Sequence, residues 1–475
     1  MKILLTGATG YIAKHLLPVL LESGHHVVCC VRDVERFTLG QQTVSPLLEV
    51  VQADFLDPVS LESIPTDIDA AYYLIHSMAR STADFAALEA QSARNFVARM
   101  EKTAIKQVVY LSGIVNDERL SRHLKSRKQV EEILSSGHFA LTTLRAGIII
   151  GSGSASFEII RDLVEKLPIM VAPRWLHTKT QPIASSNVIE FLHGVLLREN
   201  TFHQSFDIGG PDILTYKEML LRFARVRGLK RWIGVVPVMT PRLSSYWLYF
   251  ITSTSYALAV NLVNSMKVEV ICRPNKLADQ LGIKLIPYDQ AIALTFDKIE
   301  QNQVVSSWKD ALTSDVLGKG VSQYIQVPVN GCYRDERKKA VQDATHTLNR
   351  IWSIGGENGW YYADWLWNLR GFVDKLQGGV GLRRGRTNRT ELNTGDALDF
   401  WRVILASRAE KRLLLYAEMK LPGEAWLEFR IDADNILHQT ATFRPWGLKG
   451  RLYWYSVLPF HHFIFNGMIG RIAKA

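Results

Sequence analysis

The sequence predicts an α/β protein in which a doubly wound parallel sheet with a small, mostly helical subdomain is followed by an α+β domain. Three observations support this fold class. Short apolar runs alternate with stretches of helical periodicity as far as residue 144, which indicates βαβ units. Mostly helical patterns follow, and strands joined by short polar turns come after residue 320. We therefore expect domains at residues 1–215, 216–320 and 323–475.

Six apolar runs in the first domain have the length of buried strands. They are Ile3–Leu5, His26–Val31, Leu48–Gln52, Ala71–Ile75, Gln107–Leu111 and Ala140–Leu144. Between them, Lys14–Leu21 and Leu88–Met100 carry apolar residues at helical spacing. The alternation predicts a parallel sheet that is covered by helices on both faces.

The C-terminal third has the pattern of an antiparallel meander. Its expected strands are Leu398–Leu405, Arg412–Met419, Ala425–Ile431 and Leu437–Phe443. An early strand is expected near Tyr324–Arg334, helical stretches near Lys338–Trp352, and a closing helix at Pro459–Ala475.

The composition is that of a globular chain. Of its 475 residues, 47% are apolar and 21% are charged, which excludes disordered and low-complexity classes. The four cysteines have no CxxC spacing, so neither a metal site nor a disulfide framework is expected, and a reducing cytoplasm is the expected location. Polar residues interrupt the apolar run Tyr246–Val263, which we interpret as a buried helix and not as a transmembrane segment. The net charge of +10 is spread out and no recognition motif accompanies it, so no nucleic-acid partner is expected.

A glycine-rich loop lies between the first expected strand and the first expected helix, in the context that is typical of dinucleotide binding. Gly7 permits a tight turn, Gly10 lets the backbone approach a pyrophosphate, and small Ala13 allows helix and strand to pack closely. The alternative is a tight turn that binds no ligand. The residues expected to bind the cofactor are Thr6, Gly7, Thr9, Gly10, Tyr11 and Ile12.

The residues after the second and third strands are expected to contact the nucleoside part of the cofactor. Arg32 comes first after the second run and suits the 2′-phosphate of NADP, whereas Asp33 suits the ribose of NAD. NADP(H) is therefore preferred over NAD(H), with a solvated Arg32 as the alternative. Asp54 and Phe55 follow the third strand, where a carboxylate and a ring are expected to flank the adenine; an ordinary loop carboxylate fits equally well.

At these residues the chain resembles the extended, atypical branch of the short-chain dehydrogenase/reductase superfamily, which includes nucleoside-diphosphate-sugar epimerases. The resemblance covers about residues 1–300. It is carried by Thr6–Ala13, Val31-Arg32, Asp54-Phe55, Tyr72–Ser77 and Leu111–Gly113. It implies a Rossmann fold with NAD(P)(H)-dependent oxidoreductase or epimerase chemistry.

The catalytic pattern departs from that superfamily, which uses a Tyr, a Lys four residues later and a Ser that holds the substrate oxygen. Ser112 matches the Ser, but the helical pair falls on His123 and Arg127, and the Tyr is missing. Three interpretations stay open: cofactor binding without this chemistry, His123 as the acid or base beside a protonated Arg127, or a different register. His76, after the fourth strand, is a further candidate, although a loop histidine bonded to the backbone fits as well.

Residues 323–475 resemble the START and polyketide-cyclase superfamily, whose helix-grip fold curls an antiparallel sheet around a long C-terminal helix. The order of strand, helices, meander and closing helix carries this resemblance. It implies a cavity for a hydrophobic small molecule, and the many tryptophans suit either such a pocket or a filled core. The closing helix is expected either on its own sheet or in peripheral contact with a membrane. Arg383, Arg384, Arg386 and Arg389 either meet an anion or are solvated.

The sequence therefore predicts an NADP(H)-binding oxidoreductase or epimerase-like protein that acts on, or sequesters, a hydrophobic small molecule. A non-catalytic NADP(H) sensor is the alternative, because the Tyr and Lys pair is missing. A lipid or isoprenoid carrier that uses the first domain only as a scaffold is a third class.

Overall fold

The chain folds into two compact units in the computed structural model. Up to residue 300, which lies in the first unit, the structure describes residues 1–32, 34, 37, 45–75, 85–114, 122–151, 154–236 and 266–300. In the second unit it describes residues 327, 332–376, 381, 386, 391–445 and 447–474. The expected buried helix Tyr246–Val263 and His76 lie outside these residues, as do Arg383, Arg384 and Arg389.

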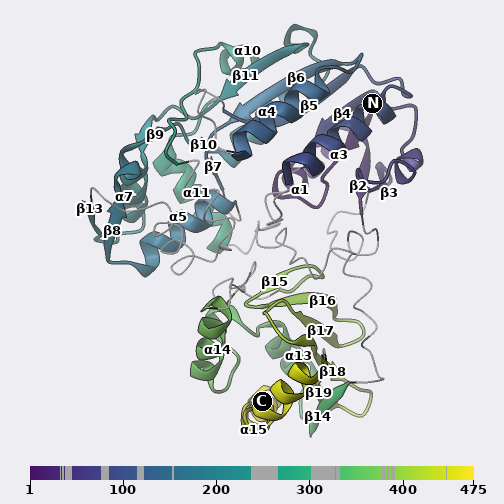
Figure 1. Cartoon of the computed structure of the whole chain (residues 1–475), viewed down its shortest axis with the longest axis vertical. Helices are drawn as coiled ribbons and strands as arrows, with labels where there is room; N and C mark the ends of the chain where they lie inside the picture. The colour runs from purple at the N-terminus through teal and green to yellow at the C-terminus, as the bar shows by residue number, and fades with distance from the viewer. Residues whose placement is uncertain are drawn as a thin grey trace. The chain divides into compact units, whose positions relative to one another are not determined.

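The first unit is built on a seven-stranded parallel sheet with the order β11-β6-β5-β4-β1-β2-β3, which confirms the doubly wound fold (Figure 1). The chain order reverses between β1 and β4, so their carboxyl ends flank the crevice where such sheets bind ligands. The strands are β1 (Lys2–Leu5), β2 (His26–Val31), β3 (Leu48–Gln52), β4 (Ala70–Tyr73), β5 (Gln107–Gly113), β6 (Ala140–Ala146) and β11 (Gln204–Ile208).

Helices cover both faces of this sheet because its strands are apolar on both sides. Ile3 and Leu5 face α1 and α6, whereas Leu4 between them faces α3 and α4. Each face therefore has its own core cluster. The helices are α1 (Tyr11–Glu22), α3 (Phe85–Met100), α4 (Arg122–Leu134) and α6 (Ser185–Gly194).

A smaller cluster of the first unit packs beside the main sheet. Its core joins Phe157, Phe223 and Phe296, whose rings lie 5.6–5.7 Å apart. The elements are α5 (Ala155–Lys166), β8 (Ile169–Pro173), α7 (Tyr216–Val226), β13 (Trp232–Val236) and α11 (Tyr288–Glu300). The remaining short elements of the first unit are η1 (Ser60–Ser63), β7 (Ile149–Ile150), η2 (Arg174–His177), β9 (Lys179–Thr180), β10 (Ile183–Ala184), η3 (Glu199–Thr201), β12 (Leu214–Thr215) and α10 (Leu277–Leu281). Because α5 and β8 precede residue 215, this cluster contains residues from both sides of the boundary expected between residues 215 and 216. That boundary stays a prediction.

The second unit is an α+β domain with a six-stranded antiparallel sheet, in the order β14-β19-β18-β17-β16-β15. Helix α15 packs along β19 and β14 (Figure 1). The strands are β14 (Tyr333–Ala340), β15 (Ala397–Leu398), β16 (Trp401–Ser407), β17 (Arg412–Ala417), β18 (Gly423–Ile431) and β19 (Ile436–Pro445). The helices are α13 (Ala344–Trp352), η6 (Gly356–Asn358), α14 (Asp364–Leu376) and α15 (Gly447–Ile472).

Two expected boundaries in the second unit were wrong. Residues 338–340 belong to β14, because the strand pairs with β19 as far as Ala340, and α13 begins only after Asp343 accepts the N–H groups of Thr345 and His346. The closing helix begins at Gly447 and continues through Pro459, which had been expected to start it.

The core of the second unit gathers aromatic rings between the sheet and its helices. Trp360 and Trp367 stack 5.0 Å apart, and Phe400 lies 5.8 Å from Trp401. Arg386, expected at an anion site or in solvent, instead donates to the backbone carbonyl oxygens of Trp352 and Ile354. Among the helices that the structure describes, none is long and apolar enough to span a bilayer.

Candidate dinucleotide-binding site

The loop between β1 and α1 presents backbone N–H groups at the crevice beside β4. Gly10 is the N-cap of α1 and has no side chain to cap the helix, so the helix N-terminus offers the positive end of its dipole at this crevice. The N–H of Gly10 donates to the carbonyl oxygen of Gly7 over 2.7 Å, which closes a tight turn. Gly7 has φ +64°, and a Cβ there would lie 2.7 Å from the carbonyl oxygen of Leu74. Only glycine fits this approach to the end of β4.

Thr6 fixes this loop to the neighbouring strand. Its buried hydroxyl donates to the carbonyl oxygen of Tyr72 over 3.0 Å and accepts the N–H of Leu74 over 3.1 Å. The backbone N–H of Thr6 also donates to Tyr72. Thr6 therefore holds the carboxyl ends of β1 and β4 together, which fixes the loop at the crevice.

The remaining predicted loop residues lie around the helix N-terminus. Thr9 is exposed and Ile12 is half-buried. The ring of Tyr11 lies 4.6 Å from His15, and its hydroxyl oxygen lies beside the backbone of Gly151, where a Cβ would be 2.5 Å away. Tyr11 thus packs the segment after β7 against α1, and its contact with a cofactor stays a prediction.

The residues expected at the nucleoside end have three different environments. Arg32 is exposed directly after β2. The carboxylate of Asp54 accepts the N–H of Leu56 over 3.1 Å, which stabilises the turn after β3. The Phe55 ring is buried 5.9 Å from Phe96 in the core. The contact of Arg32 with a phosphate and the contacts of Asp54 and Phe55 with the adenine all stay predictions.

The expected catalytic residues lie at the end of β5 and on α4. The Ser112 hydroxyl is buried and has no hydrogen-bond partner among the described residues. Arg127 donates from Nη1 to the carbonyl oxygen of Leu111 over 2.9 Å, so its guanidinium fixes α4 to β5. His123 lies on α4 one turn before Arg127, but its side chain is outside the described part of the chain. The structure thus brings Ser112 and Arg127 to one strand end.

A buried carboxylate, which the sequence did not reveal, connects α3 and α4 behind this site. The hydroxyl of Ser126 donates to Glu89 over 2.5 Å, and both side chains are at most 4% exposed. Burial raises the pKa of the nearby Tyr110 phenol, which donates to the backbone of Arg127. A Tyr with a raised pKa is not the lowered-pKa acid of the reductase pattern.

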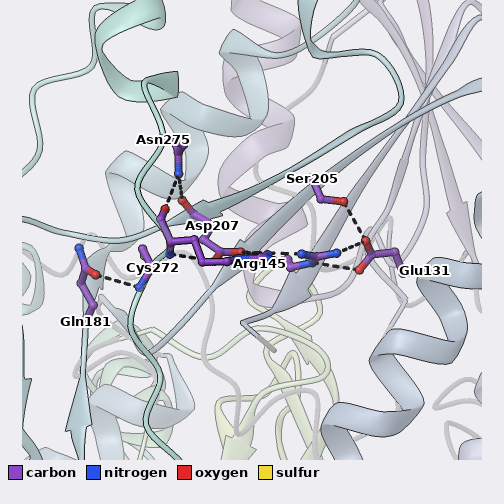
Figure 2. A network of polar contacts seen from close by, with 8 residues as sticks. Glu131, Arg145, Gln181, Ser205, Asp207, Cys272 and Asn275 are labelled. Atoms are coloured by element: carbon purple, nitrogen blue, oxygen red, sulfur yellow. Dashed lines mark hydrogen bonds and ion pairs between the residues drawn. The ribbon is translucent and has the colours of Figure 1, made fainter. Parts of the chain in front are cut away.

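Ser112, Arg145 and Asp207 form a polar row across β5, β6 and β11. In the register of the sheet, Ser112 of β5 lies opposite Arg145 of β6, and Arg145 lies opposite Asp207 of β11. The three side chains are therefore on one face and at the same level of the sheet. Figure 2 shows the Arg145 guanidinium between Glu131 of α4, 2.5 Å away, and Asp207, 4.0 Å away. The row therefore continues the Ser112 site toward the sheet edge.

Asp207 fastens a distant segment to that edge. Its side chain is fully buried and accepts Nε and Nη2 of Arg273 over 2.8 and 2.9 Å, while Asn275 donates to its backbone (Figure 2). Burial and Asp207 raise the pKa of Cys272 to about 12, so this thiol is not a nucleophile. The sequence gives little signal here, because β11 is a short strand with polar residues and the partner of Asp207 lies 66 residues away.

Two family models match the chain. Residues 7–160 match a family described as NAD(P)H-binding, and residues 331–468 match a family described as a protein of unknown function, DUF2867. The NAD(P)H-binding match includes the loop from Gly7 and every strand from β2 to β6.

Solved structures with the same fold include two bacterial proteins. A triphenylmethane reductase from Citrobacter sp., solved with NADP(H), is 15% identical, and the match covers 62% of this chain and 100% of that chain with a TM-score of 0.51. A nucleoside-diphosphate-sugar epimerase from Staphylococcus aureus is 14% identical, with 62% and 99% covered and a TM-score of 0.50. The first unit has the fold of NAD(P)H-binding reductases and epimerases.

A curated relative is also a reductase. The chloroplastic divinyl chlorophyllide a 8-vinyl-reductase of Arabidopsis thaliana is 22% identical over 225 residues, which are 44% of this chain and 53% of the relative. The match thus spans about half the length of that relative.

Proposed function

We propose that the chain is an NADP(H)-dependent oxidoreductase of the reductase and epimerase type that acts on a hydrophobic small molecule. The observation that carries this proposal is the uncapped N-terminus of α1 beside Gly7, at the point where the strand order reverses. The NAD(P)H-binding family match supports it, as do the two relatives that are named reductases.

NADP(H) is the proposed cofactor because Arg32 is an exposed cation where the second strand ends. A guanidinium binds a phosphate through charge-assisted hydrogen bonds, and NAD(H) has no 2′-phosphate to offer. Arg32→Ala should therefore weaken NADPH binding about tenfold or more and leave NADH binding nearly unchanged. Equal losses for both nucleotides would contradict this role of Arg32.

The bound nicotinamide supplies a hydride, and the protein has to hold the substrate and move a proton. Ser112 suits the first task because its buried hydroxyl lies at the end of β5, the strand next to β4 at the crevice. We assign the proton to His123, one helical turn from Arg127 on the same face of α4. Arg127 acts as a positioning residue, since its bond to Leu111 fixes that turn to β5.

NADPH oxidation over a panel of hydrophobic aldehydes and ketones tests this function. His123→Ala should lower kcat at least a hundredfold, the usual size of a general acid or base contribution. Ser135→Ala, at the exposed end of the same helix segment, is the matched control and should leave kcat unchanged. Full activity of His123→Ala, on any substrate that the unaltered protein reduces, would refute the assignment.

A non-catalytic NADP(H) sensor is the second candidate. Two observations favour it. The positions on α4 where the reductase pattern has a Tyr and a Lys hold His123 and Arg127, and the Arg127 guanidinium donates a hydrogen bond to the backbone carbonyl oxygen of Leu111. A sensor would bind NADPH with no turnover on any substrate, and NADPH would change the affinity of the chain for its ligand.

The second unit is the proposed holder of the hydrophobic molecule, in a fold similar to START domains. Gln439 on β19 supports this, because both polar atoms of its buried amide lack a partner among the described residues. Gln439 shares its strand face with Leu437 and Ala441, which belong to the core under α15. Native mass spectrometry of the purified protein would detect a co-purified ligand. A lipid or isoprenoid carrier would release such a ligand yet bind no nucleotide. A cytoplasmic location stays a prediction.

A further inference from the structure

Helix α14 exposes an apolar stripe to solvent. Its other face, with Trp367, packs into the core of the second unit. The exposed side chains recur at helical spacing and are large: Trp365 (65% exposed), Leu369 (52%), Phe372 (53%), Val373 (37%) and Leu376 (60%). Single exposed apolar residues are ordinary, but a continuous stripe of five on one helix marks an interaction surface.

Helix α15 exposes a second apolar surface. Phe465, Met468 and Ile469 face the sheet and are buried, as expected for a closing helix that packs on its own domain. The side that faces away from the sheet is also apolar: Leu452 (63% exposed), Tyr455 (60%), Phe460 (54%) and Phe463 (52%). A helix that packs on its domain and is still apolar toward solvent leaves part of its apolar surface without a protein partner.

The two helices lie next to each other and run in opposite directions. Tyr362, just before α14, has its ring 5.2 Å from Phe463 of α15. Further along α14, the charge of Arg370 is close enough to the Tyr453 phenol, near the start of α15, to oppose the rise in its pKa that burial causes. The two exposed apolar surfaces therefore belong to one pair of adjacent helices, which we call the α14–α15 surface.

The charge on this surface is positive. No Asp or Glu occurs among the 26 residues of α15, whereas Lys449, Arg451 and Arg471 are all exposed. Of the two carboxylates of α14, Asp374 is fully buried and accepts backbone N–H groups, whereas Asp364 is exposed in the first turn and accepts the N–H of Trp360, so one negative charge stands against the three cations of α15. Exposed aromatic and aliphatic side chains with cations beside them are the composition of helices that lie in the interface of an anionic bilayer.

We propose that the α14–α15 surface docks the protein on an anionic lipid bilayer. The apolar side chains would enter the boundary between headgroups and acyl chains, and Lys449, Arg451 and Arg471 would contact lipid phosphates. The described helices are too short or too polar to cross a bilayer, so the contact is peripheral. This inference does not depend on the proposed redox function.

Co-sedimentation of the full chain with vesicles tests the proposal. The vesicles are phosphatidylcholine alone or mixed with about 30% phosphatidylglycerol, at low and at high salt. The first variant combines Trp365→Ser with Phe372→Ser, and the second combines Phe460→Ser with Phe463→Ser. Trp232→Ser is the matched control, because Trp232 is 75% exposed but lies in the first unit. All the replaced side chains are more than half exposed, so each variant should keep the melting temperature of the parent.

The unaltered chain should bind the anionic vesicles, bind neutral ones more weakly, and lose affinity as salt rises. Each double variant should bind at least tenfold more weakly, and Trp232→Ser should bind as the parent does. Lys449→Glu combined with Arg451→Glu should remove the preference for anionic lipid. The proposal is overturned if no vesicle binds the chain or if the double variants bind like Trp232→Ser. It is also overturned if light scattering shows a dimer that the double variants dissociate, since a second copy then occupies the surface.

Discussion

Replacing Gly7 by alanine should disturb the candidate phosphate loop, because Gly7 has a left-handed backbone conformation and its Cα lies close to the backbone of Leu74. Gly7 has φ +64°, a conformation that costs an L-residue about 1 kcal/mol relative to glycine. The added Cβ would also lie 2.7 Å from the carbonyl oxygen and 2.9 Å from the carbonyl carbon of Leu74.

The magnitude follows from how far the backbone has to move. Ordinary contacts begin at 3.4 Å, so the loop or the end of β4 has to shift by about 0.7 Å. Thr6 resists that shift, because its hydroxyl binds both Tyr72 and Leu74. Overpacking of this kind costs about 1–3 kcal/mol, which gives a total loss of about 2–4 kcal/mol in the free energy of unfolding of the first unit. A shift of the same size misplaces N–H groups that have to reach phosphate oxygens, and we expect NADPH affinity to fall at least tenfold.

Gly24→Ala is the matched control for this prediction. Gly24 has φ +76° but no atom within 4 Å of its would-be Cβ, so alanine there pays only the conformational cost. Urea titrations would measure stability, and fluorescence titration with NADPH would measure affinity. If Gly7→Ala binds NADPH as tightly as Gly24→Ala, the close approach to Leu74 has no bearing on the cofactor and the reasoning fails.

Three further predictions concern charged and titratable groups. Glu418→Ala should lower the free energy of unfolding of the second unit by about 3–5 kcal/mol, because the fully buried guanidinium of Arg402 loses its ion-pair partner. The control Glu428→Ala removes one partner of a partly exposed ion pair and should cost about 1 kcal/mol or less. Equal losses in urea titrations would contradict this prediction. Burial lowers the pKa of His461 to about 4. As the pH falls from about 6.5 to 4, the unfolded chain therefore takes up a proton at this residue that the folded chain does not. The folded state should lose about 3 kcal/mol of stability over that pH range. His461→Gln should remove that slope, and an unchanged slope would refute the assignment. Asp207→Asn should lower the free energy of unfolding by about 1.5–3 kcal/mol, because the two charge-assisted hydrogen bonds from Arg273 weaken. Thermal unfolding measures this loss. An unchanged melting temperature would contradict the prediction and would show that other contacts hold residues 272–275.

Most of the parallel sheet could be predicted from the sequence because its central strands are buried on both faces, whereas the edge strand β11, which is partly exposed and polar, was missed. Such strands are continuous apolar runs, and β2 and β3 have the predicted bounds to the residue. The start of α15 could not be predicted in the same way. Proline usually marks the first turn of a helix, but here Pro459 lies inside a helix that begins where β19 ends.

The tight turn between β1 and α1 could also be predicted, because its residues are contiguous and their order alone specifies the strand, turn and helix. The contacts around it could not. Glu89 and Ser126 are 37 residues apart and Asp207 and Arg273 are 66 apart, and nothing local marks them as partners. The sequence likewise did not show that Trp365 and Phe372 face solvent, because aromatic content alone does not tell a buried ring from an exposed one.

Calorimetric titration of the full chain with NADPH tests the central claim most directly. We expect one saturable site per chain that binds NADPH more tightly than NADH, with an affinity that is at least tenfold lower in Gly7→Ala and unchanged in Gly24→Ala. Absence of heat from both nucleotides at millimolar concentration, with the protein folded, would contradict it.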